Sequence, residues 1–384
     1  ITDFVLGDEG RCRALWPEGL APEPLAAFIE SEPLDDVFSF LRVLRDVDCE
    51  SRRDMACFES GGKYRRTGAI YRNRTTYEDL YHMCSRVRWN GEGIDDDAAS
   101  SALADLVQMR TFSIVGPGSR SHRLVRIHSL ARSACDLIQR VVEKSLAGRS
   151  PVGLDLVAEL ARRAEGGRLD IVTLNHDLLV EQLLRREQIP YLDGFGAADG
   201  DVRWFDDRAF DHGGSAVRLI KPHGSINWRT FGGSGTRLGV AAESGEDALL
   251  RDGTGHVLRT SSKKSRFLTG AGKLVSYNHG VFAEMTFRFQ DALRSNDTMV
   301  MSGYGWGDVG INLRIESWLD QGERRRLILL HQAPETLQSA SLQLDQSYRH
   351  WESSGKMVCI RRWLCELGVD EMIALLADAE VTIY

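Results

Sequence analysis

The chain has 384 residues, of which 42% are hydrophobic, and carries a formal net charge of -7. This length accommodates two or three domains, and the acidic balance argues against a protein that binds nucleic acid directly and unaided. No stretch approaches eighteen uninterrupted apolar residues and the first residues lack a basic segment, so the sequence favours neither a membrane span nor a signal peptide.

The seven cysteines form no C-x-x-C pair and are odd in number. This pattern disfavours a zinc module and a complete disulfide framework, and it favours a reducing compartment. We therefore expect a cytoplasmic protein without a bound metal. Because the chain begins with Ile1 rather than Met, we also expect residues to be missing from it.

The N-terminal half of the sequence predicts one strand followed by helices. Residues 3–7 form a short apolar run that ends at Gly7, and apolar residues then recur at helical spacing from 25 to about 164. Ser150 followed by Pro151 is typical of a helix N-terminus with proline at the first helical position. We interpret residues 1–12 as the first strand of a core and residues 13–165 as a mainly helical insertion.

After residue 166 the pattern changes to strands alternating with helices, which is typical of an α/β fold with a parallel sheet. The Gly-, Ser- and Thr-rich stretch at about 229–275 predicts an irregular insertion or lid, and the remainder of 166–384 completes the core. Strands are predicted at 169–174, 217–221, 298–302, 327–331 and 357–360, and helices near 178–186, 281–294, 310–320, 335–347 and 366–378.

Thr173-Leu-Asn-His-Asp177 closes one predicted strand and opens a helix. Ligands of parallel α/β sheets bind beyond the carboxyl ends of strands, so Asn175 is placed to project into a crevice, with Asp177 at the helix N-terminus. The alternative is an ordinary strand-to-helix turn, because Asn and Asp dominate such turns and Asp177 would serve as a helix cap.

Lys221-Pro-His-Gly-Ser-Ile-Asn-Trp228 follows the next predicted strand. Pro222 and Gly224 place His223 on a sharp turn, where an imidazole with an ordinary pKa of about 6.5 accepts a proton from water or a ribose hydroxyl. The alternative is a histidine whose ring is satisfied by backbone hydrogen bonds at a strand end.

Ser302-Gly-Tyr-Gly-Trp-Gly-Asp308 alternates glycine with aromatic residues after a third strand. Such glycines let backbone amides approach a phosphate or ribose, Tyr304 or Trp306 offers an apolar wall, and Asp308 or Asn312 offers groups for ribose hydroxyls. The alternative is a capped turn before a helix. Taken together, the three strand ends predict a dinucleotide site with hydrolytic potential.

In this order the segments resemble the sirtuin-like (silent-information-regulator-two-like) family of bacterial defence proteins. That family shows T-x-N-x-D, then K-x-H-G-S-x-x-W, then G-Y-x-x-x-D-x-x-I-N. The match covers roughly residues 165–320 and the first strand, and residues 76–80 resemble the entry to the family's helical insert. The resemblance implies a Rossmann-like parallel sheet with a large, mainly helical insertion after the first strand.

The resemblance further implies an NAD glycohydrolase, with NAD as the substrate, which cleaves the nicotinamide–ribose bond. In this interpretation Asn175 positions the ribose or the attacking water, His223 is the base, and Asp177 holds Asn175 or interacts with the developing charge. The residues expected to bind NAD are Gly7, Thr173, Gly224, Ser225, Gly303, Tyr304, Asp308 and Asn312.

Two departures from the family pattern affect this interpretation. The chain lacks the paired C-x-x-C zinc module of sirtuin deacetylases, which makes NAD-dependent protein deacylation the less favoured activity. Gly7 is followed by Asp8-Glu9-Gly10 where the family has a G-A-G-x-S phosphate loop. Either residues are missing between Gly7 and Asp8, or the chain is a non-catalytic NAD- or ADP-ribose-binding subunit of a defence complex.

An unrestrained NAD hydrolase would kill its host, so we expect antiphage activity that is controlled by homo-oligomerisation or by a partner. We expect the helical insertion to be the interface, and the resemblance implies a HerA-type ATPase as that partner. The chain has no P-loop of its own.

Overall fold

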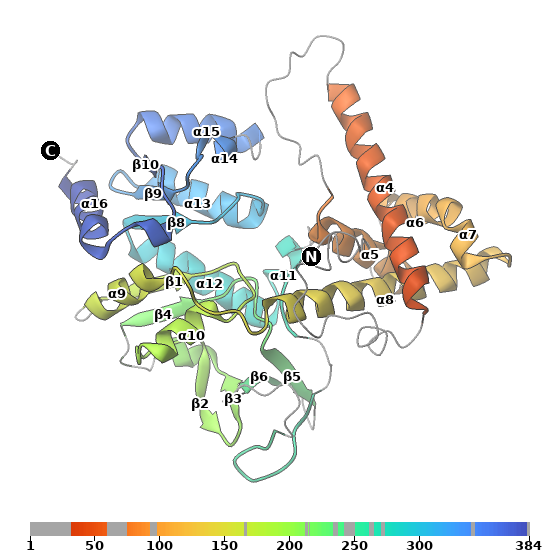
Figure 1. The fold of residues 1–384 in the computed structure, drawn as a ribbon, viewed down its shortest axis with the longest axis horizontal. Helices are drawn as coiled ribbons and strands as arrows, with labels where there is room; N and C mark the ends of the chain where they lie inside the picture. Colours follow the sequence, from red (N-terminus) through yellow and green to blue (C-terminus); the bar gives the residue numbers. More distant parts are fainter. Residues whose placement is uncertain are drawn as a thin grey trace. The chain divides into compact units, whose positions relative to one another are not determined.

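The computed structural model describes residues 32–59, 75–92, 98–164, 167–211, 214, 216–232, 237–241, 250–260, 265–269, 273–338 and 342–381. The chain divides into two compact units (Figure 1). One is helical and its described elements lie before Ala147; the other comprises Gly148–Leu268 and Lys273–Tyr384. The expected first strand, with Gly7, lies outside the described residues, so the boundaries at 12 and 165 stay predictions.

The first unit is built around a long central helix, α8 (Arg120–Leu146). Helix α8 begins after Ser119, whose side chain accepts a hydrogen bond from the amide of His122. Its buried residues recur at spacings of three and four, which is the pattern of an amphipathic helix. The other helices of this unit are α4 (Leu34–Glu59), α5 (Tyr77–Glu92), α6 (Ala98–Arg110) and α7 (Phe112–Val115).

The predicted helix start at Ser150 and Pro151 is wrong. Helix α9 (Asp155–Arg163) begins four residues after Pro151, with Leu154 as its N-cap. The reason is Gly153, which adopts a left-handed φ of 78° and turns the chain before the helix can begin.

The second unit contains two groups of parallel strands. Strand β1 (Leu169–Val172) pairs with β4 (Val217–Ile220), and β9 (Arg326–Leu330) lies between β8 (Thr298–Ser302) and β10 (Met357–Ile360). All four residues of β4 are buried, as expected for a strand covered on both faces. These five strands agree with the predicted ones to within two residues, and the α/β class is confirmed.

Helices α10, α12 and α13 also confirm the predictions, whereas the helix predicted at 335–347 is two helices, α14 and α15. The last helix, α16, begins three residues later than expected. The bounds are α10 (Leu179–Arg186), α11 (Lys273–Ser276), α12 (Gly280–Ser295), α13 (Val309–Gln321), α14 (Glu335–Gln338), α15 (Leu342–Ser353) and α16 (Val369–Val381).

The structure differs from the irregular insertion expected at about 229–275. Described residues of that stretch join an antiparallel sheet of order β2-β3-β6-β5-β7. Gly239 permits this packing, because a Cβ there would lie 2.7 Å from the Val202 side chain and 3.1 Å from Phe231 and Trp204. The strands are β2 (Phe195–Asp199), β3 (Val202–Phe205), β5 (Trp228–Gly232), β6 (Arg237–Ala241) and β7 (Arg259–Thr260).

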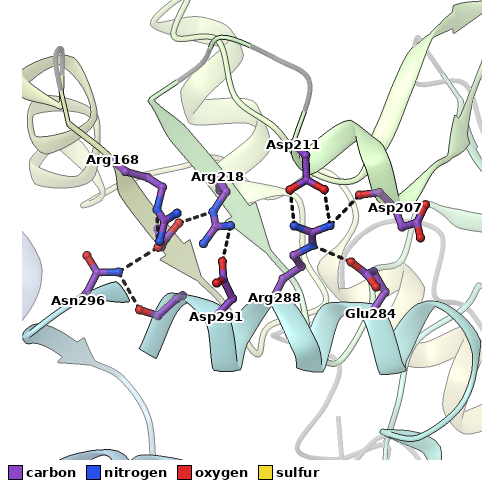
Figure 2. A network of polar contacts seen from close by, with 10 residues as sticks. Arg168, Asp207, Asp211, Arg218, Glu284, Arg288, Asp291 and Asn296 are labelled. Carbon is purple, nitrogen blue, oxygen red and sulfur yellow. Dashed lines mark hydrogen bonds and ion pairs between the residues drawn. The ribbon is translucent and has the colours of Figure 1, made fainter. Parts of the chain in front are cut away.

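Two buried arginines join α12 to the segments packed beside it (Figure 2). Arg218 on β4 donates to Asp170 on β1 at 2.6 Å and to Asp291 on α12 at 2.9 Å. Arg288 on α12 donates to both carboxylate oxygens of Asp211, at 2.6 and 2.9 Å. These charge-assisted bonds join segments far apart in the sequence, so the network fixes α12 against the β1–β4 pair.

We predict that Arg218→Met lowers the free energy of unfolding by about 3 kcal/mol, because it leaves the buried carboxylate of Asp170 without its main partner. The control is Arg168→Met, since the half-exposed Arg168 side chain also pairs with Asp170, at 3.3 Å, and an exposed pair contributes less than about 1 kcal/mol. Urea unfolding measures both changes. Equal losses for the two variants would contradict this account of the network.

Candidate active site at the ends of parallel strands

The register of β1 against β4 brings two of the predicted site segments together. Val172 pairs with Ile220, and the amide of Thr173 donates to the Ile220 carbonyl at 3.0 Å. Asn175 and His223 each lie three residues beyond these paired positions. The two loops are joined again further on, where the amide of Ile226 donates to the His176 carbonyl at 2.9 Å.

A buried lysine connects the loops that follow β1 and β4. Lys221 is 3% exposed, and its Nζ donates to Glu181 Oε1 at 2.8 Å and to Ser225 Oγ at 2.9 Å. The same ammonium donates to the carbonyl of Asp177. Lys221 therefore links the loop after β4 both to the loop after β1, through Asp177, and to the first turn of α10, through Glu181. Ser225, predicted to bind NAD, is fully buried and belongs to this link.

Gly224 meets a strict steric requirement at the turn that carries His223. Its φ is 76°, and an added Cβ would lie 2.4 Å from the Arg266 carbonyl oxygen and 2.9 Å from Phe267 Cα. Both neighbours are backbone atoms, which cannot move aside as a flexible side chain does. The glycine of the K-x-H-G-S segment is thus required for the loop to close against residues 266–267.

His223 lies in a compact hydrogen-bonded group with Tyr277 and Asp308. Its Nε2 lies 2.6 Å from the Tyr277 hydroxyl and 3.1 Å from Asp308 Oδ2, and that hydroxyl donates to Asp308 Oδ2 at 2.8 Å. All three residues are buried. Lys273 Nζ lies 3.9 Å from the same carboxylate oxygen. Asp308, at the end of the glycine-rich segment after β8, therefore contacts His223 in the segment after β4.

Burial and charge perturb three titratable groups of this site. Burial would raise the pKa of Asp308, but hydrogen bonds and charge from His223 and the hydroxyl of Tyr277 outweigh it and hold that pKa below its usual range. Burial and the neighbouring Asp308 charge raise the pKa of Tyr277. Burial and the nearby charges of His223, Lys273 and Lys221 lower the pKa of His176. Asp308 is therefore ionised and Tyr277 protonated at neutral pH.

The glycine-rich turn after β8 combines an exposed backbone with buried side chains. Gly303 is exposed, has a φ of 71°, and would offer no contact within 4 Å to an added Cβ. Tyr304 is half-buried and donates to Asn312 Oδ1 at 2.6 Å, and Asn312 donates to the Trp306 carbonyl at 3.0 Å. Trp306 is 1% exposed in the core, so it is not the exposed apolar wall that we expected.

Of the other predicted residues, Asn175 is exposed to solvent, whereas the carboxylates of Asp177 and Asp308 accept hydrogen bonds from backbone amides. Asn175 is exposed, and its backbone amide donates to Thr173 Oγ1 at 3.2 Å. Asp177 Oδ1 accepts from the amide of Leu179 at 3.1 Å, so its side chain caps the turn into α10. Asp308 accepts from the amide of Ile311 and thereby caps α13. Asp308 is thus the helix cap considered from the sequence, whereas Asp177 stabilises the turn ahead of α10, whose N-cap is Leu178.

Tyr277 and Lys273 were not predicted from the sequence as site residues. Both come from α11 and the residue after it, at the end of the stretch that we expected to be irregular. No spacing relates them to the three motifs, and they meet Asp308 only because the chain folds back on itself. Nothing in the sequence therefore marks them as members of this site.

Within the described part of the chain, no group of three or more His, Cys, Asp or Glu side chains is arranged to hold a metal ion. Among the described helices, none combines the length and the apolar character that a membrane crossing requires.

Residues 170–352 match the SIR2-like domain family. This range contains the three segments that carry the site, and such a domain implies a Rossmann-like fold and the use of NAD. No curated protein matches the chain.

We predict that Gly224→Ala lowers the free energy of unfolding by about 3 kcal/mol, since left-handed strain and a backbone clash combine. The matched control is Gly303→Ala, which has a similar φ and open space around it, and so costs only about 1 kcal/mol of strain. Chemical denaturation compares the two variants. A loss at Gly303 as large as that at Gly224 would contradict the steric argument.

We further predict that His176 makes stability depend on pH. Its pKa is lower in the folded protein, so below the unfolded value of about 6.5 only the unfolded chain binds the proton. The resulting loss grows as pH falls toward the folded pKa and reaches about 1.4 kcal/mol at a pH of about 5.5. Urea unfolding of wild type and His176→Gln at several pH values measures this, and parallel pH dependences of the two proteins would exclude it.

Proposed function

We propose that this protein hydrolyses NAD at the bond between nicotinamide and ribose. One observation carries the proposal: the exposed amide Asn175 and the hydrogen-bonded group of His223, Asp308 and Tyr277 lie at neighbouring strand ends of a domain that implies NAD use. Ligands of α/β sheets bind at this edge.

The reaction needs orientation more than a strong nucleophile. The bond between ribose C1′ and the nicotinamide nitrogen breaks, its electron pair neutralises the pyridinium, and water oxygen forms a new bond to C1′. The products are nicotinamide, ADP-ribose and one proton, which the His223 imidazole accepts. Asn175 orients the ribose or the water, with Asp177 beside it. Such orientation supplies a large share of catalysis when the reacting carbon becomes cationic.

The described residues of the site are compatible with a dinucleotide. The exposed backbone at Gly303 has open space beside it, which suits the close approach of a ribose or phosphate. His176 Nδ1 is buried without a hydrogen-bond partner in the described structure, so a polar acceptor or donor is available beneath the loop of Asn175. The phosphate-binding role proposed for Gly7 concerns a residue outside the described ranges.

A second candidate is a non-catalytic subunit that binds NAD or ADP-ribose. The observation that favours it is the burial of His223, which is 4% exposed with Nε2 engaged by Tyr277 and Asp308. A protein deacylase is less favoured, since the cysteine spacing lacks a zinc module. We propose that the hydrolase acts in antiphage defence by depleting NAD, under the control of homo-oligomerisation or a HerA-type ATPase partner.

We predict that the purified protein, alone or with its partner, converts NAD to nicotinamide and ADP-ribose. His223→Ala should lower turnover by a factor of about 100 to 10,000, because the proton acceptor is lost. Chromatographic separation of the products measures the rate. The control is His256→Ala, since the His256 side chain is 83% exposed on a hairpin outside the site.

Turnover unchanged by His223→Ala would refute its role as base. Tight binding of NAD without release of nicotinamide, under every condition that includes the partner, would favour the non-catalytic subunit instead.

A further inference from the structure

Tyr277 contacts both members of the His223–Asp308 pair. Its hydroxyl lies 2.6 Å from His223 Nε2 and 2.8 Å from Asp308 Oδ2, and its ring is nearly parallel to the imidazole, with centroids 5.9 Å apart. At 2% exposure the tyrosine is packed in the core, and its ring cannot swing away without opening the structure. Its hydroxyl is therefore a fixed feature of the site.

The three groups allow only one arrangement of hydrogens. An ionised Asp308 accepts and donates nothing, and a protonated Tyr277 has one hydrogen to give. Suppose instead that this hydrogen pointed at His223 Nε2. Asp308 Oδ2 would then lie 2.8 Å from the Tyr277 oxygen and 3.1 Å from His223 Nε2, with no hydrogen available for either contact. When the hydroxyl donates to Asp308, Nε2 must carry a hydrogen of its own and donate it to these oxygens.

We propose that Tyr277 is a positioning residue which, together with Asp308, holds the neutral ring of His223 in the tautomer that has its hydrogen on Nε2. The lone pair of the neutral ring then lies on Nδ1, and Nδ1 is the atom that accepts the proton released on NAD hydrolysis. This inference rests on the proposed function for its catalytic consequence, and on the geometry and the protonation states of Asp308 and Tyr277 for the tautomer.

Three other charged or titratable groups of the described residues lie near the His223–Asp308 pair. Lys273 Nζ lies 3.9 Å from Asp308 Oδ2 and neutralises part of its charge. The His176 ring is 6.0 Å from that of His223, and the Arg314 guanidinium lies 5.7 Å from the centre of the Tyr277 ring. Of the contacts recorded for Nε2, those with Tyr277 and Asp308 are hydrogen bonds, and that with Tyr277 is the shorter. Loss of the hydroxyl removes the shorter of these two bonds to Nε2.

The test uses nitrogen-15-labelled histidine in the full chain, with long-range proton–nitrogen NMR spectra at a pH where the ring is neutral. The signals of His223 are identified by their loss in His223→Gln. We expect a hydrogen on Nε2 in the wild type and a mixture of both tautomers in Tyr277→Phe. With NAD, Tyr277→Phe should lower kcat about 10-fold to 100-fold and leave KM within about twofold, because the tyrosine orients the base without touching the substrate.

The matched control is Tyr348→Phe, which removes another buried hydroxyl, one that donates to the Pro334 carbonyl away from this site. It should change neither the His223 signals nor kcat. A wild-type hydrogen on Nδ1, or His223 signals unchanged in Tyr277→Phe, would overturn the proposal. If the wild type releases no nicotinamide, the proposed function fails, and the tautomers of the wild type and of Tyr277→Phe, measured without substrate, still decide the role of Tyr277.

Discussion

The parallel pairing of β1 with β4 is the constraint on which the rest of the site depends. Because Val172 lies opposite Ile220, the residues that follow the two strands leave the sheet side by side. A shift of one residue in this register would send the side chains of β4, all buried, toward the opposite face. The hydrophobic packing of the sheet therefore also fixes the positions of Asn175 and His223.

Buried polar groups convert this approximate placement into a defined geometry. Lys221 with Glu181 joins the two loops beneath the site, and Asp308 caps α13 while it receives the hydrogen bonds of His223 and Tyr277. Each of these groups is costly to bury without its partners, so partial formation of the network is unfavourable. The site is consequently assembled as a unit, and its parts are fixed by the same interactions that stabilise the fold.

Much of the α/β core could be predicted from the sequence, because buried parallel strands are continuous apolar runs and the site segments follow them directly. The same local patterns placed Asn175, His223 and Asp308 at strand ends. The antiparallel sheet could not be predicted, since its short strands depend on cross-strand contacts such as those around Gly239. Two site residues could not be predicted for the same reason. The burial of Trp306 and the contact of Tyr277 with His223 both follow from tertiary packing, which the local sequence pattern does not encode.

We propose that Asn175 and His223 serve the same reacting carbon of the substrate, C1′ of the ribose. A crystal structure of the inactive His223→Gln variant with intact NAD tests it most directly. We expect the ribose C1′ to lie beside the Asn175 amide, with room for one water molecule between C1′ and residue 223, because the water oxygen and C1′ are the atoms that must approach each other. NAD bound at another surface, or with its C1′ turned away from both residues, would contradict this proposal.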